Sequence, residues 1–275
     1  MDERIETINE RAAAAAFNKQ AALFDDLYSG DTIIQYKRRR VREHILKFLQ
    51  PHSRILELNS GTGDDAIFLA KRGHKIHATD ISALMQNLLA EKAKLYNVQK
   101  SISCELRSFT DLENLSDKGP YDMIFSNFAG LNCTNELDKV LLSLNSLLKP
   151  GGIVTMVILP KFSLWEFLLL FKGKFKTAFR RFSGEKGSKA HIEGEYFRCW
   201  YYNPSFIKKH LRNSFTMIGI EGLCSIVPPS YLHGFAEKYP SFFRRLVEHE
   251  EKLKTRWPWK VIGDYYIISF RKTGK

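Results

Sequence analysis

Blocks of apolar and polar residues along positions 50–160 predict a regular alternation of strands and helices. Short runs rich in Ile, Val, Leu and Phe are typical of buried strands, and longer segments with apolar residues three or four positions apart are typical of helices. The predicted strands are residues 54–58, 75–79, 101–106, 121–128 and 153–159. The predicted helices are residues 64–71, 82–96 and 136–148. This order favours a parallel sheet covered by helices on both faces, a doubly wound α/β fold.

The regions on either side of this core are predicted from the same patterns. Two helices, at about 3–29 and 32–49, precede it and are separated by a Ser-Gly-Asp break. The strand–helix rhythm fails from residue 161 to about 197, which indicates an insertion. Beyond it we predict a helix at 203–212, a strand region at 215–226, a helix at 241–256 and a strand at 264–272. Because these last strands would complete the sheet, the insertion interrupts one domain and does not separate two.

The composition is that of a folded protein. Of 275 residues, 44% are hydrophobic and 26% are charged, which excludes a disordered or collagen-like chain. No apolar run reaches the roughly 18–20 residues of a membrane span, and the charged N-terminus lacks the apolar region of a signal peptide. The four cysteines, at 104, 133, 199 and 224, have neither CxxC nor zinc spacing. We therefore expect free thiols in a reducing cytoplasm and no metal site.

The formal net charge of +12 is unevenly distributed. Residues 161–190 carry eight Lys or Arg against two Asp or Glu, which is half of the net charge, and residues 37–42 (KRRRVR) add five cations. Such runs suggest nucleic acid, an anionic membrane surface or an acidic substrate as a partner. For residues 37–42 we favour a simpler interpretation, a solvated helix face, because short basic runs are common.

The candidate site begins where the first predicted strand ends. Residues 55–63 (ILELNSGTG) run from that strand into a turn, and Gly61 and Gly63 remove side chains where a ligand must approach the backbone. Asp80 ends the next strand, where a carboxylate can accept both hydroxyl groups of a ribose. Ligands of open parallel sheets lie outside the carboxyl ends of the strands, so the turn and the acid indicate one site.

These residues resemble the first motif of class I S-adenosylmethionine-dependent methyltransferases, acid-x-Gly-x-Gly-x-Gly, which begins here at Glu57. The family's Tyr/Phe-Asp strand resembles residues 121–128, and its Leu-Lys-Pro-Gly-Gly turn resembles residues 148–152. The resemblance covers residues 17–160 well and the later strands more loosely. It implies a Rossmann-like, seven-stranded, mostly parallel sheet. It also implies S-adenosylmethionine as the cofactor, S-adenosylhomocysteine as the product, and no metal.

The resemblance also implies roles for individual residues. Glu57 supports the methionine end of the cofactor, Asp80 binds the ribose, and Phe109 either stacks on the adenine or is a core residue. Asn59 replaces the family's first glycine; Asn tolerates a left-handed backbone but adds a side chain beside the cofactor. The implied cofactor-binding residues are Phe24, Glu57, Asn59, Ser60, Gly61, Gly63, Asp80, Ile81, Ser108, Phe109, Asn127 and Phe128.

Four regions follow from pattern and resemblance together. They are an N-terminal helical lid (1–50), a cofactor-binding α/β core (51–160), a cap on the acceptor side (161–197) and a C-terminal completion of the sheet (198–275). Methyl transfer needs mostly positioning of the acceptor, and the sequence identifies no catalytic residue. His191, His233 and Asn127 are candidates, each with a structural alternative: surface or core histidines, and a loop-capping asparagine.

The cap is the most individual part of the sequence. Residues 162–171 are apolar almost throughout, and residues 172–182 alternate aromatic side chains with cations. A helical cap docked on the sheet, a lid over an apolar acceptor, membrane contact through residues 161–182, and RNA binding all remain open.

The resulting hypothesis is a cytoplasmic methyltransferase, with peripheral contact at the inner membrane surface as an alternative. It would methylate oxygen or carbon of a small or lipid-like acceptor, and the oligomeric state is open. The basic charge motivates an RNA or protein methyltransferase as a rival. A non-catalytic binding module is a second rival, and a nicotinamide-dependent dehydrogenase is a third. The dehydrogenase fingerprint would place its last small residue at Ala66.

Overall fold

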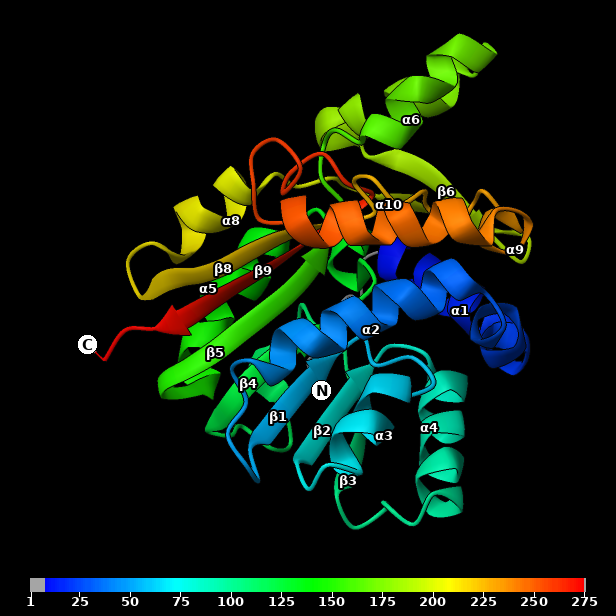
Figure 1. Cartoon of the computed structure of the whole chain (residues 1–275). Helices are drawn as coiled ribbons and strands as arrows, with labels where there is room; N and C mark the ends of the chain where they lie inside the picture. Colours follow the sequence, from blue (N-terminus) through cyan, green and yellow to red (C-terminus); the bar gives the residue numbers. More distant parts are fainter. Residues whose placement is uncertain (1–7, 275) are drawn as a thin grey trace.

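A single sheet organises the computed structural model, which describes residues 8–274 (Figure 1). Within these residues, seven strands form the sheet in the order β3-β2-β1-β4-β5-β9-β8. β9 runs antiparallel to both of its neighbours, and the other strand pairs are parallel. The strands are β1 (Arg54–Leu58), β2 (Lys75–Asp80), β3 (Ile102–Leu106), β4 (Tyr121–Ser126), β5 (Leu148–Ile158), β8 (Phe215–Leu223) and β9 (Tyr265–Lys272). The predicted Rossmann-like, seven-stranded, mostly parallel sheet is confirmed. Its reversed β9 distinguishes it from the 3-2-1-4-5-6 order of dinucleotide-binding folds.

Both faces of the sheet are buried because successive strand residues point to opposite sides. The helices that cover them are among α1 (Ile8–Ser29), α2 (Thr32–Leu46), α3 (Asp64–Ala70), α4 (Ala83–Leu95), α5 (Leu137–Leu147), α8 (Pro204–Leu211), α9 (Phe235–Lys238) and α10 (Pro240–Leu253). In β1, Leu56 and Leu58 join the hydrophobic cluster that includes residues of α5 and α8, whereas Ile55 joins the cluster of α2, α3 and α4 on the other face. None of the helices within residues 8–274 is long and apolar enough to cross a membrane.

Most predicted elements are present with shifted ends. β4 stops at Ser126, two residues before its predicted end, because Phe128 has a positive φ of 45° that an extended strand excludes. β5 begins at Leu148, where the Leu-Lys-Pro-Gly-Gly turn pairs with Tyr121. Ser82 caps α4 as predicted, since its hydroxyl accepts the Met85 N–H at 3.2 Å. Residues 3–7 of the first predicted helix lie outside the described residues.

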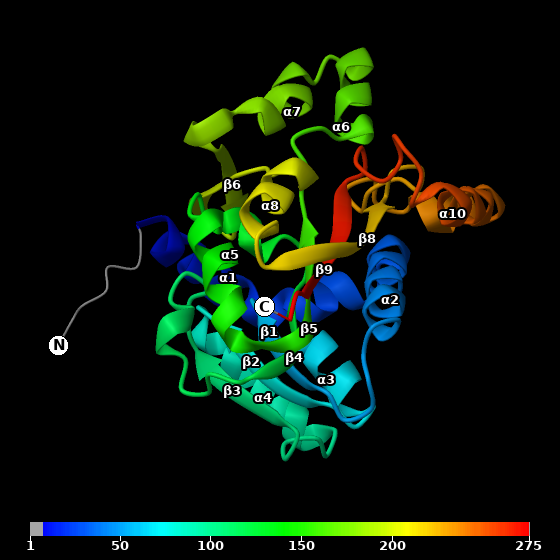
Figure 2. The ribbon, with the colours of Figure 1, turned by 90° about the vertical axis from the view of Figure 1, so that its left-hand side faces the viewer.

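The predicted cap adds no strand to the main sheet. It contains two short helices, α6 (Leu164–Leu168) and α7 (Phe175–Phe179), followed by a separate hairpin of β6 (Ser188–Ile192) and β7 (Glu195–Cys199). The hairpin packs on α1, and the two helices stand out above the rest of the chain (Figure 2). The strand–helix rhythm fails here because these elements belong to no layer of the sheet.

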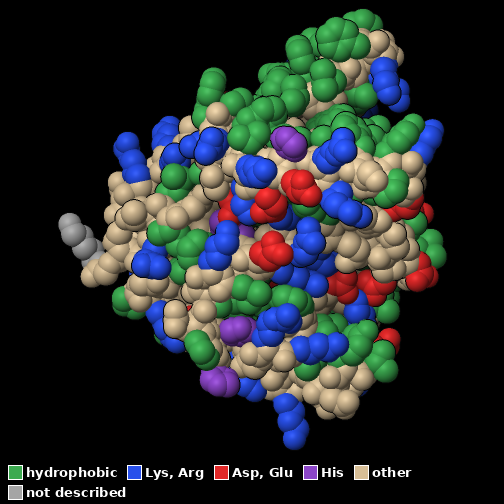
Figure 3. Space-filling view, viewed as in Figure 1, with side chains coloured by type: hydrophobic (Ala, Val, Ile, Leu, Met, Phe, Trp, Pro, Cys, Tyr) green, Lys and Arg blue, Asp and Glu red, His purple; other side chains and the backbone are tan. Residues whose placement is uncertain are grey.

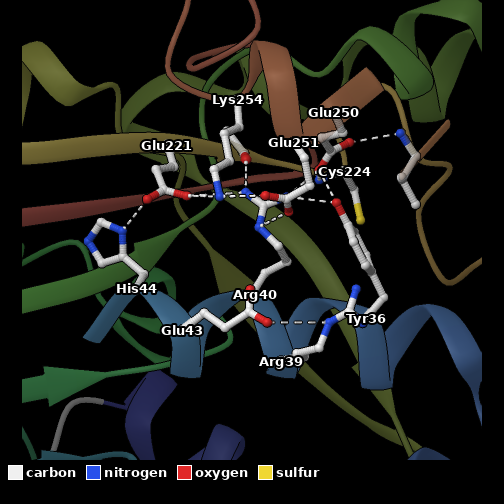
Figure 4. A network of polar contacts seen from close by, with 12 residues as sticks. Tyr36, Arg39, Arg40, Glu43, His44, Glu221, Cys224, Glu250, Glu251 and Lys254 are labelled. Carbon is white, nitrogen blue, oxygen red and sulfur yellow. Dashed lines mark hydrogen bonds and ion pairs between the residues drawn. The ribbon is translucent and has the colours of Figure 1, made fainter. Parts of the chain in front are cut away.

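The basic run at residues 37–42 is not the solvated helix face that we expected. Lys37, Arg38 and Arg40 are buried on α2. The Arg40 guanidinium lies 3.3 Å from the Glu221 carboxylate and 3.4 Å from that of Glu250, and the Tyr36 hydroxyl donates to Glu250 (Figure 4). Four more contacts join the same network: His44 lies 2.8 Å from Glu221, and Glu250 accepts the backbone N–H groups of Cys224, Ile226 and Val227. The run therefore ties α2 to β8 and α10, and these cations are not available to a nucleic acid.

Candidate functional site

A pocket of about 870 Å³, counted with its open mouth, lies at the carboxyl ends of β1, β2 and β4 beneath α1. Parallel strands place their following loops together at this edge. All but two of the predicted cofactor residues line the pocket: Phe24, Glu57, Asn59, Ser60, Gly61, Asp80, Ile81, Phe109, Asn127 and Phe128. The two that do not line it are Gly63 and Ser108.

The glycine turn and Asp80 are joined by hydrogen bonds. Gly61 N–H donates to one oxygen of the Asp80 carboxylate, and Ser82 N–H donates to the other, both at 2.9 Å. Burial raises the pKa of Asp80, and these backbone hydrogen bonds act in the opposite direction. Gly61 has a φ of 56° and open space where a Cβ would lie. The carboxylate is therefore held at the pocket wall, with lone pairs left for further donors.

Gly63 is required for the packing of the turn against α4 and does not line the pocket. A Cβ at this position would lie 1.9 Å from the Leu89 side chain on α4, and the backbone φ is 81°. Both conditions require glycine here, because a side chain would meet the neighbouring helix and strain the turn.

Asn59 stabilises the turn through its side chain. Its φ of 47° is left-handed, as the sequence analysis allowed for asparagine. Its amide donates to the backbone oxygen of Asn127 at 2.8 Å, and its side-chain oxygen accepts from the Ser126 hydroxyl at 2.6 Å. The side chain therefore links the loop after β1 to the end of β4.

The pocket floor carries a buried acid with an unused oxygen. Glu57 is 2% exposed, and its Oε2 has no hydrogen-bond partner among the described residues. Burial, followed by the nearby Asp65 carboxylate, raises the pKa of Glu57 well above its ordinary value. Arg38 of α2 lines the same pocket, with its guanidinium 3.5 Å from Asp65 and 3.3 Å from Asp64. Its Nε is also without a partner among these residues. Arg38 was not predicted as a site residue, because its basic neighbours in the sequence suggested an exposed helix face.

α1 closes over the pocket and is held there by polar contacts. Ala13, Phe17 and Phe24 of α1 line the pocket. Asp25 accepts from the Thr62 hydroxyl at 2.6 Å and from Lys92 at 2.8 Å. These contacts join the predicted lid to the glycine turn and to α4.

The wall beyond Asp80 is partly apolar. Phe109 is buried, belongs to the hydrophobic core and also lines the pocket, so both predicted roles are compatible with its position. The Ser108 hydroxyl instead donates to Glu10 at 2.7 Å. Arg107, which the sequence analysis did not consider, lines the pocket and pairs with Asp111 at 2.8 Å.

Of the three catalytic candidates, Asn127 alone lines the pocket. Its amide donates to Asp65 at 2.7 Å, and its side-chain oxygen accepts the Phe128 N–H at 2.8 Å. His191 lies exposed on β6 beside the Tyr196 ring, and His233 lies exposed in the loop before α9. Within residues 8–274, no group of three His, Cys, Asp or Glu side chains is arranged to hold a metal ion.

A protein-family model matches part of the chain. Residues 55–152 match the model of a family described as a methyltransferase domain. No curated protein matches the chain significantly in sequence.

Several solved structures are similar over most of their length. One is the (4+2)-cyclase SpnF, with 16% identity, 97% of each chain covered and a TM-score of 0.63. A second is the 1,6-didemethyltoxoflavin-N1-methyltransferase of Burkholderia thailandensis with bound 1,6-didemethyltoxoflavin and S-adenosylhomocysteine. It has 14% identity, 99% of this chain and 93% of that chain covered, and a TM-score of 0.54. A third is the CcbJ methyltransferase of Streptomyces caelestis, with 15% identity, 86% and 94% covered, and a TM-score of 0.56. At these identities the likeness establishes the fold alone.

Proposed function

We propose that this chain, whose residues 55–152 match a methyltransferase-domain family, is a class I S-adenosylmethionine-dependent methyltransferase acting on oxygen or carbon of a small or lipid-like acceptor. The observation that carries the proposal is a pair of unpartnered polar atoms, Glu57 Oε2 and Arg38 Nε, in two residues that line the pocket. A buried carboxylate oxygen and a buried guanidinium nitrogen without hydrogen-bond partners lower the stability of the fold unless a ligand supplies those partners.

The residues of the pocket fit this cofactor. Its methionine end carries an ammonium and a carboxylate, which Glu57 Oε2 and the Arg38 guanidinium would bind by charge-assisted hydrogen bonds. Asp80 would accept the ribose hydroxyls, and Phe109 and Ile81 would contact the adenine.

When bound, the cofactor supplies a methyl group already made electrophilic by a positively charged sulfur. This chain's own task is then to orient the acceptor and exclude water. Phe17 and Phe24 of α1 cover the pocket, and the Asp25 contacts hold α1 in place. No histidine among the described residues lines the pocket. We therefore favour acceptors whose oxygen or carbon is acidic enough to lose its proton without a dedicated histidine base.

Two observations bear on the rivals. Burial of Lys37, Arg38 and Arg40 weakens the case for an RNA substrate, because these three cations of the basic run at residues 37–42 are not on the surface. The (4+2)-cyclase named above has a similar fold. The fold therefore does not define the reaction, and cofactor binding and methyl transfer must be measured separately.

Calorimetric titration of the folded protein with S-adenosylmethionine and S-adenosylhomocysteine tests the proposal. We expect micromolar binding that Asp80→Asn weakens by about 1.5–3 kcal/mol, the usual contribution of hydrogen bonds to a charged group. Asn retains the shape of Asp but replaces one acceptor oxygen by a donor. Glu91→Gln, at an exposed position of α4, is the matched control and should bind as the wild type does.

Absence of binding by the well-folded wild type would contradict the proposal. Tight binding without methyl transfer to any of a panel of phenols, enols and isoprenoid acceptors would favour the binding-module alternative.

A further inference from the structure

The outer part of the cap exposes an unusual amount of apolar surface. Phe171 is 85% exposed and Phe175 is 62% exposed, although such side chains normally lie inside a folded protein. In the space-filling view, apolar side chains gather over the α6 region at the top of the molecule (Figure 3). The exposed large apolar residues between positions 167 and 182, which we call the cap tip, are Phe167, Leu168, Phe171, Phe175, Phe179 and Phe182.

The cap tip is held out from the protein by a buried ionic anchor at its base. The Glu166 carboxylate is fully buried and accepts from Arg180 and Arg181, both at 2.6 Å. Arg181 also donates to Asp264 at 2.8 Å, at the start of the last strand, and to the backbone oxygen of Pro160. Breaking a buried pair of this kind is costly. The aromatic side chains are therefore presented to the outside by a fixed structure.

Exposed lysines alternate with these aromatic residues. Lys172, Lys174 and Lys176 lie between Phe171 and Phe179, and all three are exposed. Arg181 is buried in its pair with Glu166, whereas Arg180 pairs with the same carboxylate but stays partly exposed, so it adds to the outward positive charge of the three lysines. Apolar rings flanked by lysines suit the interface of a membrane with anionic headgroups, where rings enter the acyl boundary and ammonium groups meet phosphates.

We propose that the cap tip docks on membranes that contain anionic phospholipids. A second copy of this chain is a poorer occupant, because a two-fold contact would bring the same lysines together. The cap also stands at the end of the molecule to which the carboxyl ends of the parallel strands point (Figures 1 and 2). Docking would place the methyl-transfer site on the membrane side, within reach of a lipid-like acceptor. The docking itself does not depend on the proposed activity.

Vesicle sedimentation of the full-length chain tests this surface without cofactor or acceptor. We expect the chain to bind vesicles of phosphatidylcholine mixed with phosphatidylglycerol, and to bind pure phosphatidylcholine at least tenfold more weakly. Raised salt should weaken the binding. The double substitution Phe171→Ser and Phe175→Ser, and the triple substitution of Lys172, Lys174 and Lys176 by Gln, should each weaken it at least tenfold, since each lysine contributes about fivefold at an anionic surface.

Matched control variants change the same chemistry elsewhere. Leu142→Ser alters an exposed apolar residue of α5, and the double substitution Lys208→Gln and Lys209→Gln alters exposed cations of α8. Neither should affect vesicle binding, and unchanged thermal unfolding would show that every variant folds.

Three results would overturn the proposal. The first is that the wild type ignores anionic vesicles at low salt. The second is that the cap-tip variants bind vesicles as the wild type does. The third is that a cap-tip variant leaves vesicle binding unchanged but alters another interaction. Examples are loss of a dimer, seen by light scattering, in the aromatic variant, or loss of binding to single-stranded RNA in the lysine variant.

Discussion

Replacing Glu57 by Gln should make the free protein more stable and the cofactor complex weaker. Glu57 is buried beside Asp65, with one carboxylate oxygen unpaired among the described residues. Gln has nearly the same shape but no charge to desolvate. The expected gain in unfolding free energy at neutral pH is roughly 1–3 kcal/mol, because each pKa unit by which folding raises the Glu57 pKa costs about 1.4 kcal/mol once the unfolded carboxyl is ionised. That gain corresponds to a melting temperature higher by roughly 2–10 °C.

The direction of the Glu57 pKa shift determines how the stability difference between the wild type and Glu57→Gln depends on pH. The pKa of Glu57 in the folded state lies above its value in the unfolded chain, about 4.3. The stability that protonated Glu57 contributes is therefore fully present below pH ~4.3. It is lost as the pH rises toward the folded-state pKa, because the unfolded chain releases the proton first. The glutamine side chain of the variant does not titrate, so the stability curves should converge at acid pH and separate, with the variant higher, toward neutral pH.

Glu57→Gln should lower the affinity for the cofactor although it raises the stability of the free protein. The ammonium of the methionine end would pair with ionised Glu57 and lower its pKa, so binding should release a fraction of a proton between pH ~4.3 and the raised pKa. In Glu57→Gln this release should vanish and the affinity should fall by roughly 1.5–3 kcal/mol. Calorimetry in two buffers of different ionisation enthalpy measures both quantities.

Glu105→Gln is the matched control, because its pKa is shifted the other way. Burial acts to raise the pKa of Glu105, but hydrogen bonds from Ser116 and Arg107 outweigh it and lower the pKa. Losing this carboxylate should therefore destabilise the protein above the ordinary carboxyl pKa and leave cofactor binding unchanged. A Glu57→Gln variant that melts lower than the wild type at neutral pH, or binds the cofactor equally well, would refute the reasoning.

Two further substitutions test the supports of the site. Asn59→Gly introduces the glycine that the methyltransferase motif has at this position. It should lower the unfolding free energy by roughly 1–2 kcal/mol in urea unfolding, because two side-chain hydrogen bonds are lost. The control Asn97→Gly, at an exposed left-handed residue, should not destabilise the protein. Arg40→Met should lower the unfolding free energy by roughly 3–5 kcal/mol because it leaves Glu250 buried without its guanidinium. The exposed Arg39→Met should change it by less than about 0.5 kcal/mol, and equal effects of the two arginine variants would argue against the buried network.

Local patterns in the sequence were enough to predict the α/β fold and the edge of the sheet at which the pocket lies. Apolar periodicity follows from backbone geometry, which a short segment carries within itself. The turn at Gly61 and the acid at Asp80 lie at strand ends, and parallel strands bring such ends to one edge. The predicted strand ends at Phe128 and Ile226 were wrong by a few residues. Single left-handed residues, Phe128 and Cys224, end the extended backbone there.

Only the tertiary structure decided which side chains meet. From the sequence alone, Arg40 is expected to belong to a basic surface because its acidic partners, Glu221 and Glu250, lie 181 and 210 positions away. The same holds for Arg38, which enters the pocket because α2 packs beside the loop after β1. The partner of a charge depends on contacts between distant segments, and no spacing along the chain encodes it. Sequence therefore determined where a ligand can approach the sheet, and packing determined which charged groups would bind it.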